Sequence, residues 1–169
     1  EWLEKAEEVF KVAQNSSLAT AKVYEAMAKI FFDFNRKDQA IAYYQDMLKM
    51  NSAEFSVKSV EQYLNLQIKK LVEEREPKKD EERTVYKEPE KENLKILENL
   101  DHLLRISPTV ERYNLLGSAN KRFAYLFESY EPFLQEAIDH YHFAFINEKN
   151  EVKRYAYPLS NLLQLLYFY

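Results

Sequence analysis

The chain has no cysteine and only one glycine, Gly117, among its 169 residues. The absence of cysteine removes disulfides, thiolate nucleophiles and most zinc sites, and it fits the reducing cytoplasm in which we expect the protein. With a single glycine, no loop can cradle a nucleotide phosphate as a P-loop or a dinucleotide-binding turn does. We therefore expect no cofactor.

Long apolar runs and an excess of positive charge are also missing. No apolar run approaches the ~20 residues that a membrane-spanning helix needs, so we expect no membrane segment. The net charge is −4, which lacks the basic excess that binding to a phosphate backbone requires and argues against a nucleic-acid partner. The sequence opens with Glu1 and Trp2, with neither an initiator Met nor a signal segment, and we expect a fragment of a larger protein.

What the chain does have is an internal repeat. Ala6, Phe10 and Ala13 recur 34 residues later as Ala40, Tyr44 and Met47, and side chains at spacings of three and four share one helical face. The same spacing returns at Ile96, Leu100 and Leu103 and at Ala137, Tyr141 and Ala144. We interpret these four copies as the second helices of helix hairpins.

The first helices of the hairpins carry a different pattern. It is clearest at Tyr24, Met27, Ala28 and Phe31, and it reappears at Tyr113, Leu116 and Gly117. A repeat of 34 residues with these two patterns resembles the tetratricopeptide repeat, or TPR. The resemblance implies an all-α, TPR-like right-handed solenoid of antiparallel helix pairs. We expect eight helices, at about 2–14, 21–34, 37–50, 54–73, 91–106, 109–128, 132–147 and 156–169.

Two insertions interrupt this frame, within what we expect to be a single domain over residues 1–169. The first is the charged segment from Glu73 to Glu92, which contains two prolines. It predicts a solvated, flexible insertion at about 74–91. The second lies between Gly117 and Ala137 and predicts that the first helix of that hairpin is about two turns longer.

Three stretches resemble one bacterial family more closely. They are residues 59–69, residues 106–122 including Ile106-Ser107-Pro108-Thr109-Val110-Glu111-Arg112-Tyr113, and Tyr157-Pro158-Leu159-Ser160-Asn161. They resemble the TPR region that accompanies CHAT domains, which are caspase-like proteases with a His/Cys dyad. Because this chain lacks cysteine, the resemblance implies a regulatory arm for such a protease and gives no protease activity to any residue here.

Histidines and clustered carboxylates are the remaining candidates for chemistry. His140 and His142 lie about 200° apart on a helix and cannot share a metal ion, while His102 stands alone on its predicted helix. The acidic clusters lack the spacing and the glycine of a calcium loop. We therefore expect no metal site, no catalytic residue and no enzyme activity.

The first helices of successive TPR hairpins line a concave surface, and their polar positions face a ligand. On this basis the groove-facing candidates are Lys22, Glu25, Lys29, Asp33, Lys58, Gln62, Asn65, Lys69, Glu111, Asn114, Ser118, Lys121 and Arg122. Asn side chains can hold a peptide backbone, and Lys and Arg can hold carboxylates. We predict Asn65, Lys69, Asn114, Lys121 and Arg122 as the protein-binding residues. Glu25 stands where a TPR carboxylate clamp has a basic residue, which disfavours chaperone tails as ligands.

These patterns predict a non-catalytic protein-interaction and regulatory module. Its partner would be a protein, a peptide or an effector domain of the same polypeptide. The alternative is a structural array that self-assembles through its apolar C-terminal helix, where Leu162, Leu163, Leu165 and Leu166 surround the helix. Such a helix also predicts that the parent protein continues past Tyr169.

Overall fold

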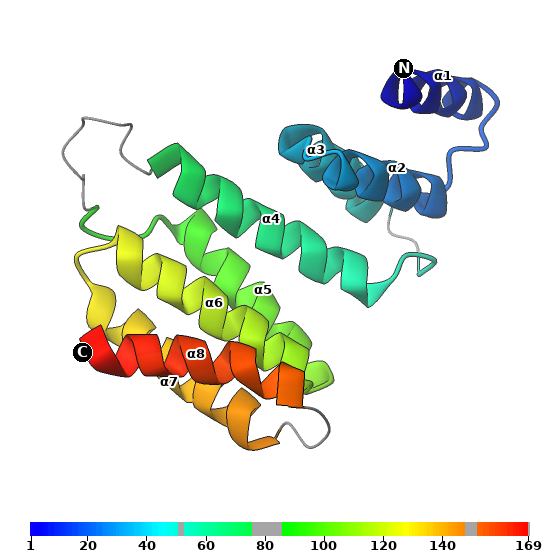
Figure 1. Cartoon of the computed structure of the whole chain (residues 1–169). Helices are drawn as coiled ribbons and strands as arrows, with labels where there is room; N and C mark the ends of the chain where they lie inside the picture. Colours follow the sequence, from blue (N-terminus) through cyan, green and yellow to red (C-terminus); the bar gives the residue numbers. More distant parts are fainter. Residues whose placement is uncertain (51–52, 76–85, 148–151, 169) are drawn as a thin grey trace. The chain divides into compact units, whose positions relative to one another are not determined.

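The computed structural model describes residues 1–50, 53–75, 86–147 and 152–168, and within them it contains eight helices. They are α1 (Trp2–Asn15), α2 (Ala21–Asp33), α3 (Lys37–Lys49), α4 (Val57–Arg75), α5 (Lys91–Ile106), α6 (Val110–Leu126), α7 (Tyr130–Asn147) and α8 (Val152–Phe168) (Figure 1). The predicted all-α, TPR-like fold is confirmed. The helices divide into two compact units, Glu1–Lys70 and Leu71–Tyr169, which are described separately.

The N-terminal unit is held together by the hairpin of α2 and α3. The repeat positions Ala40, Tyr44 and Met47 are completely buried, as are the facing residues Ala28 and Phe31 of α2. Small side chains let the two helices approach, and the aromatic rings fill the space beside them. The repeat pattern therefore marks the core side of each helix, as predicted.

A side-chain hydrogen bond caps the start of α4. Ser56 precedes the helix and its Oγ accepts a hydrogen bond from the backbone N–H of Ser59 at 3.2 Å, which is an N-cap bond. The helix consequently begins at Val57 instead of the predicted residue 54. Val57, the first residue of the helix, is 49% exposed.

Glu25 was predicted to face the concave groove, and this prediction is wrong because its side chain is buried. Glu25 is only 8% exposed. Its carboxylate accepts hydrogen bonds from the Ser59 hydroxyl and from the Ser56 hydroxyl, the latter at 2.6 Å. The carboxylate thus meets the positive end of the α4 dipole, where negative charge is favoured. Glu25 is a structural group and does not face a groove, so it supplies no argument against a carboxylate clamp.

The C-terminal unit is a stack of α5, α6, α7 and α8 (Figure 1). Its repeat positions Ala137, Tyr141 and Ala144 are completely buried. Gly117 of α6 lies against the Tyr141 ring so closely that an added Cβ would be 3.0 Å from ring carbons. The glycine is therefore required by close helix packing, as the sequence pattern indicated.

One predicted insertion is only partly within the described residues. Residues 76–85 lie outside them, but Glu73 and Arg75 belong to α4 and Tyr86 is half-buried. Tyr86 donates its N–H to the Leu126 carbonyl at 3.0 Å and accepts from the Glu128 N–H at 2.7 Å. The Arg75 guanidinium lies 5.0 Å from the Tyr86 ring centroid, a cation–π geometry. The single-domain assignment and the bounds of the insertion stay predictions.

The same contact limits the length of α6. Phe127 forms an isolated bridge with Tyr86 and is extended, with φ −115° and ψ 148°. The helix has 17 residues and α7 has 18, against 13 for each of α2 and α3. The second insertion is therefore shared between both helices of the hairpin, rather than adding two turns to the first as predicted.

The last helix begins at Val152, four residues before the predicted start at residue 156. α8 starts at Val152, so the buried Pro158 lies inside the helix and not in its first turn. A proline at such a position leaves one carbonyl without its helical donor. Leu162 and Leu165 are buried against Ala137 and Tyr141 of α7, whereas Leu163 and Leu166 are more than half exposed.

Candidate functional site

The predicted residues Asn114, Lys121 and Arg122 lie on one face of α6. Together with Ser118 they follow spacings of three, four and seven residues, which bring side chains to the same side of a helix. All of these side chains except the buried Ser118 are half-buried. The opposite side of α6 carries the fully buried Phe123, and Gly117 lies at the edge of the polar face, one turn before Lys121. The sequence thus places a polar stripe beside the core stripe of one helix.

α8 contributes the facing polar group. The Lys121 ammonium donates a short hydrogen bond to Oδ1 of Asn161, and Nδ2 of Asn161 donates to the Tyr157 carbonyl at 2.8 Å. On α6 itself, Nη1 of Arg122 donates to the Ser118 carbonyl at 3.2 Å and to the Ser118 hydroxyl. These bonds hold Lys121 between α6 and α8 and hold Arg122 against α6. We call Ser118, Lys121, Arg122, Tyr157 and Asn161, with the Tyr141 hydroxyl, the α6–α8 cluster.

The α6–α8 cluster carries positive charge without a counter-charge. Within the described part of the chain, neither Lys121 nor Arg122 forms an ion pair with a carboxylate. Burial lowers the pKa of Lys121, and the neighbouring Arg122 lowers it further, while Tyr157 opposes both. A shift in this direction is expected where a cation loses water and faces a like charge.

Two buried oxygen atoms in the C-terminal unit have no hydrogen-bond partner among the described residues. One is the hydroxyl oxygen of Tyr141 and the other is Oδ1 of Asn114. Burial raises the pKa of Tyr141 far above its usual range and Tyr157 adds to the rise, whereas Ser118 and Arg122 act in the opposite sense. Ser118, Arg122 and Tyr157 therefore lie within electrostatic range of the Tyr141 hydroxyl.

The other two predicted residues, Asn65 and Lys69, lie on α4 in the N-terminal unit and are half-buried. α4 is buried on more than one side, since Leu64, Leu66 and Ile68 are all at most 3% exposed. Gln62, also predicted to face the groove, accepts a hydrogen bond from the Tyr44 hydroxyl at 2.9 Å. Asn65 and Lys69 stay predicted binding residues, and so does the idea that all five share one surface.

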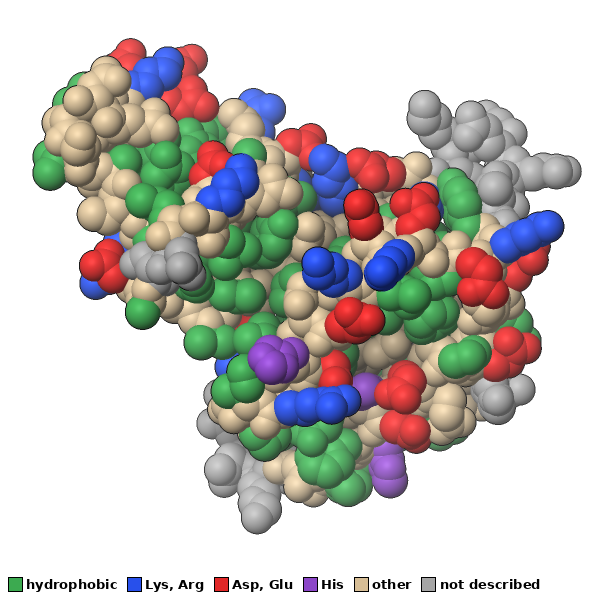
Figure 2. Space-filling view, turned by 180° about the vertical axis from the view of Figure 1, so that it is seen from behind, with side chains coloured by type: hydrophobic (Ala, Val, Ile, Leu, Met, Phe, Trp, Pro, Cys, Tyr) green, Lys and Arg blue, Asp and Glu red, His purple; other side chains and the backbone are tan. Residues whose placement is uncertain are grey.

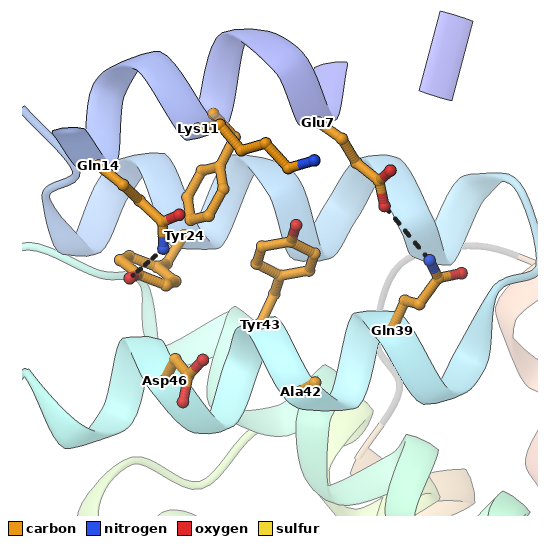
Figure 3. A pocket seen from close by; sticks show the side chains of 9 residues that line it. Glu7, Lys11, Gln14, Tyr24, Gln39, Ala42, Tyr43 and Asp46 are labelled. Carbon is orange, nitrogen blue, oxygen red and sulfur yellow. Dashed lines mark hydrogen bonds between the residues drawn. The ribbon is translucent and has the colours of Figure 1, made fainter. Parts of the chain in front are cut away.

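A cavity of about 440 Å³ lies between α1, α2 and α3. Figure 3 shows the Tyr43 hydroxyl pointing toward α1, where Lys11 and Glu7 project over it. Its polar groups have donors within the protein: Gln39 donates to Glu7 at 3.4 Å, and Gln14 donates to the Tyr24 hydroxyl at 3.1 Å. Both signs of charge are present in its lining. We therefore regard this cavity as a solvent-filled space between helices. The α6–α8 cluster is the better candidate site.

Neither a cluster of metal ligands nor a membrane-spanning helix occurs among the described residues. No group of three or more His, Asp or Glu side chains there could hold a metal ion. His140 is engaged locally, with Nδ1 lying 2.6 Å from the Glu136 carbonyl oxygen. No described helix is long and apolar enough to cross a membrane. Figure 2 shows side chains of both charge signs interspersed over the face that it presents.

Sequence reasoning missed Asn161 and the Tyr141 hydroxyl as site groups. Pro158, Leu162 and Leu165 set the buried face of α8, and Asn161 follows Pro158 at a spacing of three. A polar residue on an otherwise apolar helical face was thus a visible signal. Tyr141 was assigned to the core from its repeat position, and its ring is there. No sequence pattern shows that the hydroxyl lacks a partner.

Repeated helix pairs with small residues at the helix contacts define the class of tetratricopeptide repeat proteins. The family model described as Tetratricopeptide Repeats-Sensor matches residues 36–166, and the chain belongs to this family. Comparison with curated proteins and with solved structures found no match. Repeats of this type generally mediate protein–protein interactions and are generally non-catalytic.

Proposed function

We propose that the chain is a regulatory module that binds a protein or peptide on the face of α6 that carries Asn114, Lys121 and Arg122. The observation that carries this proposal is the buried Oδ1 of Asn114, which has no hydrogen-bond partner among the described residues and lies two helical turns from the unneutralised cations on the same face of α6. A buried oxygen without a donor costs free energy, and a peptide backbone N–H is a donor of suitable chemistry. The word Sensor in the family description supports a regulatory role.

The finer parts of the proposal come from the resemblance to TPR regions beside CHAT domains. On that basis the partner is either another protein or an effector domain of the same polypeptide, in the cytoplasm of a bacterium. Asn65 and Lys69 of α4 are proposed as further contacts, to be tested separately from the α6 residues because they belong to the other unit.

The experiment is a selection of random peptides on the whole chain, followed by affinity measurements on purified variants. Asn114→Ala combined with Arg122→Ala should weaken the selected peptides by at least tenfold while helicity by circular dichroism is unchanged, because neither side chain is in the core. Asn65→Ala combined with Lys69→Ala tests α4 in the same way. The matched control is Lys95→Ala, an exposed cation of α5. A selection that yields no saturable binder contradicts the function, and affinities within threefold of the parent move the site elsewhere.

A second candidate function is self-assembly, which the exposed side chains of α8 favour. Leu163 is 57% exposed, Leu166 is 55% exposed and Tyr167 is 84% exposed. Apolar side chains grouped on one outer helix face are typical of an interface. This candidate predicts an assembly in solution that depends on α8.

A further inference from the structure

The α6–α8 cluster has more hydrogen-bond donors than acceptors. A guanidinium has five N–H donors and an ammonium has three. Among the described residues, Arg122 bonds only through Nη1 to Ser118, and Lys121 bonds only to Asn161. The Nε and Nη2 groups of Arg122 and two N–H bonds of Lys121 therefore have no protein acceptor there. What is missing from the site is an acceptor-rich group.

The charge of the missing group follows from the same residues. Two adjacent cations are half-buried without a carboxylate within the described part of the chain. Partial burial of a charge costs free energy unless an opposite charge compensates it. Two other cations of this unit are compensated: Arg75 pairs with Glu90 at 3.3 Å, and Arg105 with Asp101 at 2.7 Å. The contrast indicates that the counter-charge at Lys121 and Arg122 comes from a ligand.

Tyr141 is an independent observation that points the same way. Its side chain is completely buried, and its hydroxyl has no hydrogen-bond partner among the described residues, although buried hydroxyl groups are almost always hydrogen-bonded. A phenylalanine would fill the same space against Gly117 without that cost. The ring packs on Gly117, the residue before Ser118, and the hydroxyl is within electrostatic range of Ser118 and Arg122, so an acceptor bound beside Arg122 would supply its partner.

We propose that the α6–α8 cluster binds an oxyanion, a phosphate or a carboxylate group, held by Lys121, Arg122 and the Tyr141 hydroxyl. Arg matches the planar, two-oxygen edge of either group, and Lys adds a point charge. The choice of face rests on the proposed function. The oxyanion is either a free small ion or part of an acidic or phosphorylated partner segment, and Asn114 then meets the neighbouring backbone.

The experiment titrates the whole chain with inorganic phosphate, and separately with glutarate, at constant ionic strength set with sodium chloride. Amide chemical shifts of residues 118–122 and the side-chain amide of Asn161 report binding. We expect saturable shifts in at least one titration. Arg122→Gln and Lys121→Gln should each weaken the affinity at least tenfold, while the control Lys95→Gln should change it less than twofold.

Tyr141→Phe separates ligand binding from packing. The variant keeps the buried ring and removes only the unpartnered hydroxyl, so without anion it should unfold at the same or a higher denaturant concentration than the parent. Its affinity for the anion should nevertheless fall severalfold.

The proposal is overturned if neither anion gives saturable shifts, or if the shifts persist in folded Arg122→Gln. It is also overturned if Tyr141→Phe loses stability and keeps its anion affinity. The anion titration contains no protein or peptide partner. A negative titration therefore contradicts the anion site without contradicting the proposed function, which the peptide selection tests. A response to both phosphate and phosphoserine peptide, with the peptide tighter, assigns the anion to a partner segment. A response to phosphate with no gain from the peptide assigns it to a free ion.

Discussion

Glu25 shows what one buried carboxylate does for a helix start. Besides the two serine hydroxyls, it receives hydrogen bonds from the Ser56 N–H at 3.3 Å and from Lys29 at 3.1 Å. Burial alone would raise the pKa of Glu25, but the bonds from Ser56, Ser59 and Lys29 outweigh it and lower the pKa to about 2 from 4.5. The ionised carboxylate therefore ties α2 to the first turn of α4.

The lowered pKa predicts a pH dependence of stability. A group whose pKa is lower in the folded chain stabilises it above the unfolded pKa, and the stabilisation is lost as pH falls through the folded pKa. For Glu25 the window runs from about pH 4.5 down to about pH 2, and the full effect is about 3 kcal/mol. Glu25→Gln should therefore lower the free energy of unfolding by about 1 to 3 kcal/mol at pH 7.

Denaturant unfolding of both proteins across pH 7 to 2 is the measurement. The difference between the parent and Glu25→Gln should be constant above pH 5 and should vanish near pH 2. Glu8→Gln, a change at an exposed carboxylate of α1, should have no comparable effect. A difference that persists undiminished to pH 2, or that is absent at pH 7, contradicts the role assigned to Glu25.

The hydrogen-bond partners of Glu25 could not be predicted from the pattern of residues along the sequence. Ser56 and Ser59 lie 31 and 34 residues away from it, and helical periodicity states which face a residue occupies without naming its bonding partner. Glu25 consequently looked like a solvated groove residue. The same limit applied to Tyr141, whose ring position was predicted while the isolation of its hydroxyl was not.

The pattern of apolar residues predicted which helices exist and their order much better than it predicted where each helix begins and ends. All eight expected helices are present, because apolar spacing reports the buried face over many residues. The misplaced ends depend on single contacts: the Ser56 cap moved the start of α4, and the pairing of Tyr86 with Phe127 ended α6. The second of these joins residues far apart in sequence, which no local pattern contains.

The contact between α2 and α3 tests the register of the repeat. Ala40 is completely buried and Ala42, two residues on, is exposed on the same helix. Ala40→Leu should overpack the helix contact and cost about 1 to 3 kcal/mol. The matched change Ala42→Leu adds the same atoms on the open side and should alter the free energy of unfolding by less than about 0.5 kcal/mol. Equal effects of the two substitutions on chemical denaturation would refute the 34-residue register.

Across the whole molecule, three of the five predicted binding residues are brought together on α6, where Asn161 joins them. Asn65 and Lys69 belong to the other unit, and their part in binding is a prediction. The sequence predicted the α6 trio because polar spacing on a first helix is local. The contribution of α8 depends on how the last helix packs beside α6, which is a tertiary contact.

We predict that the chain self-associates through the outer face of α8. Leu162 and Leu165 bind the helix to α7, while Leu163 and Leu166 point away from that core. An apolar helix face of this kind is stabilised when a second surface covers it. Contact between two copies through the same face would give a symmetric dimer. Asn161, on the inner side of the helix, would remain in the α6–α8 cluster.

We therefore expect the chain to self-associate at micromolar concentration and Leu163→Gln combined with Leu166→Gln to make it monomeric. Light scattering after size separation gives the mass, and binding of a hydrophobic dye reports the exposed face. Because both leucines are more than half exposed, the helical content should be unchanged. The control is Val9→Gln combined with Val12→Gln on α1, which removes two apolar side chains that are more exposed than the leucines and should leave the mass of the assembly as it is. A parent chain that is already monomeric and binds no dye would show that α8 needs no cover, and self-assembly would then fail as a function of this helix.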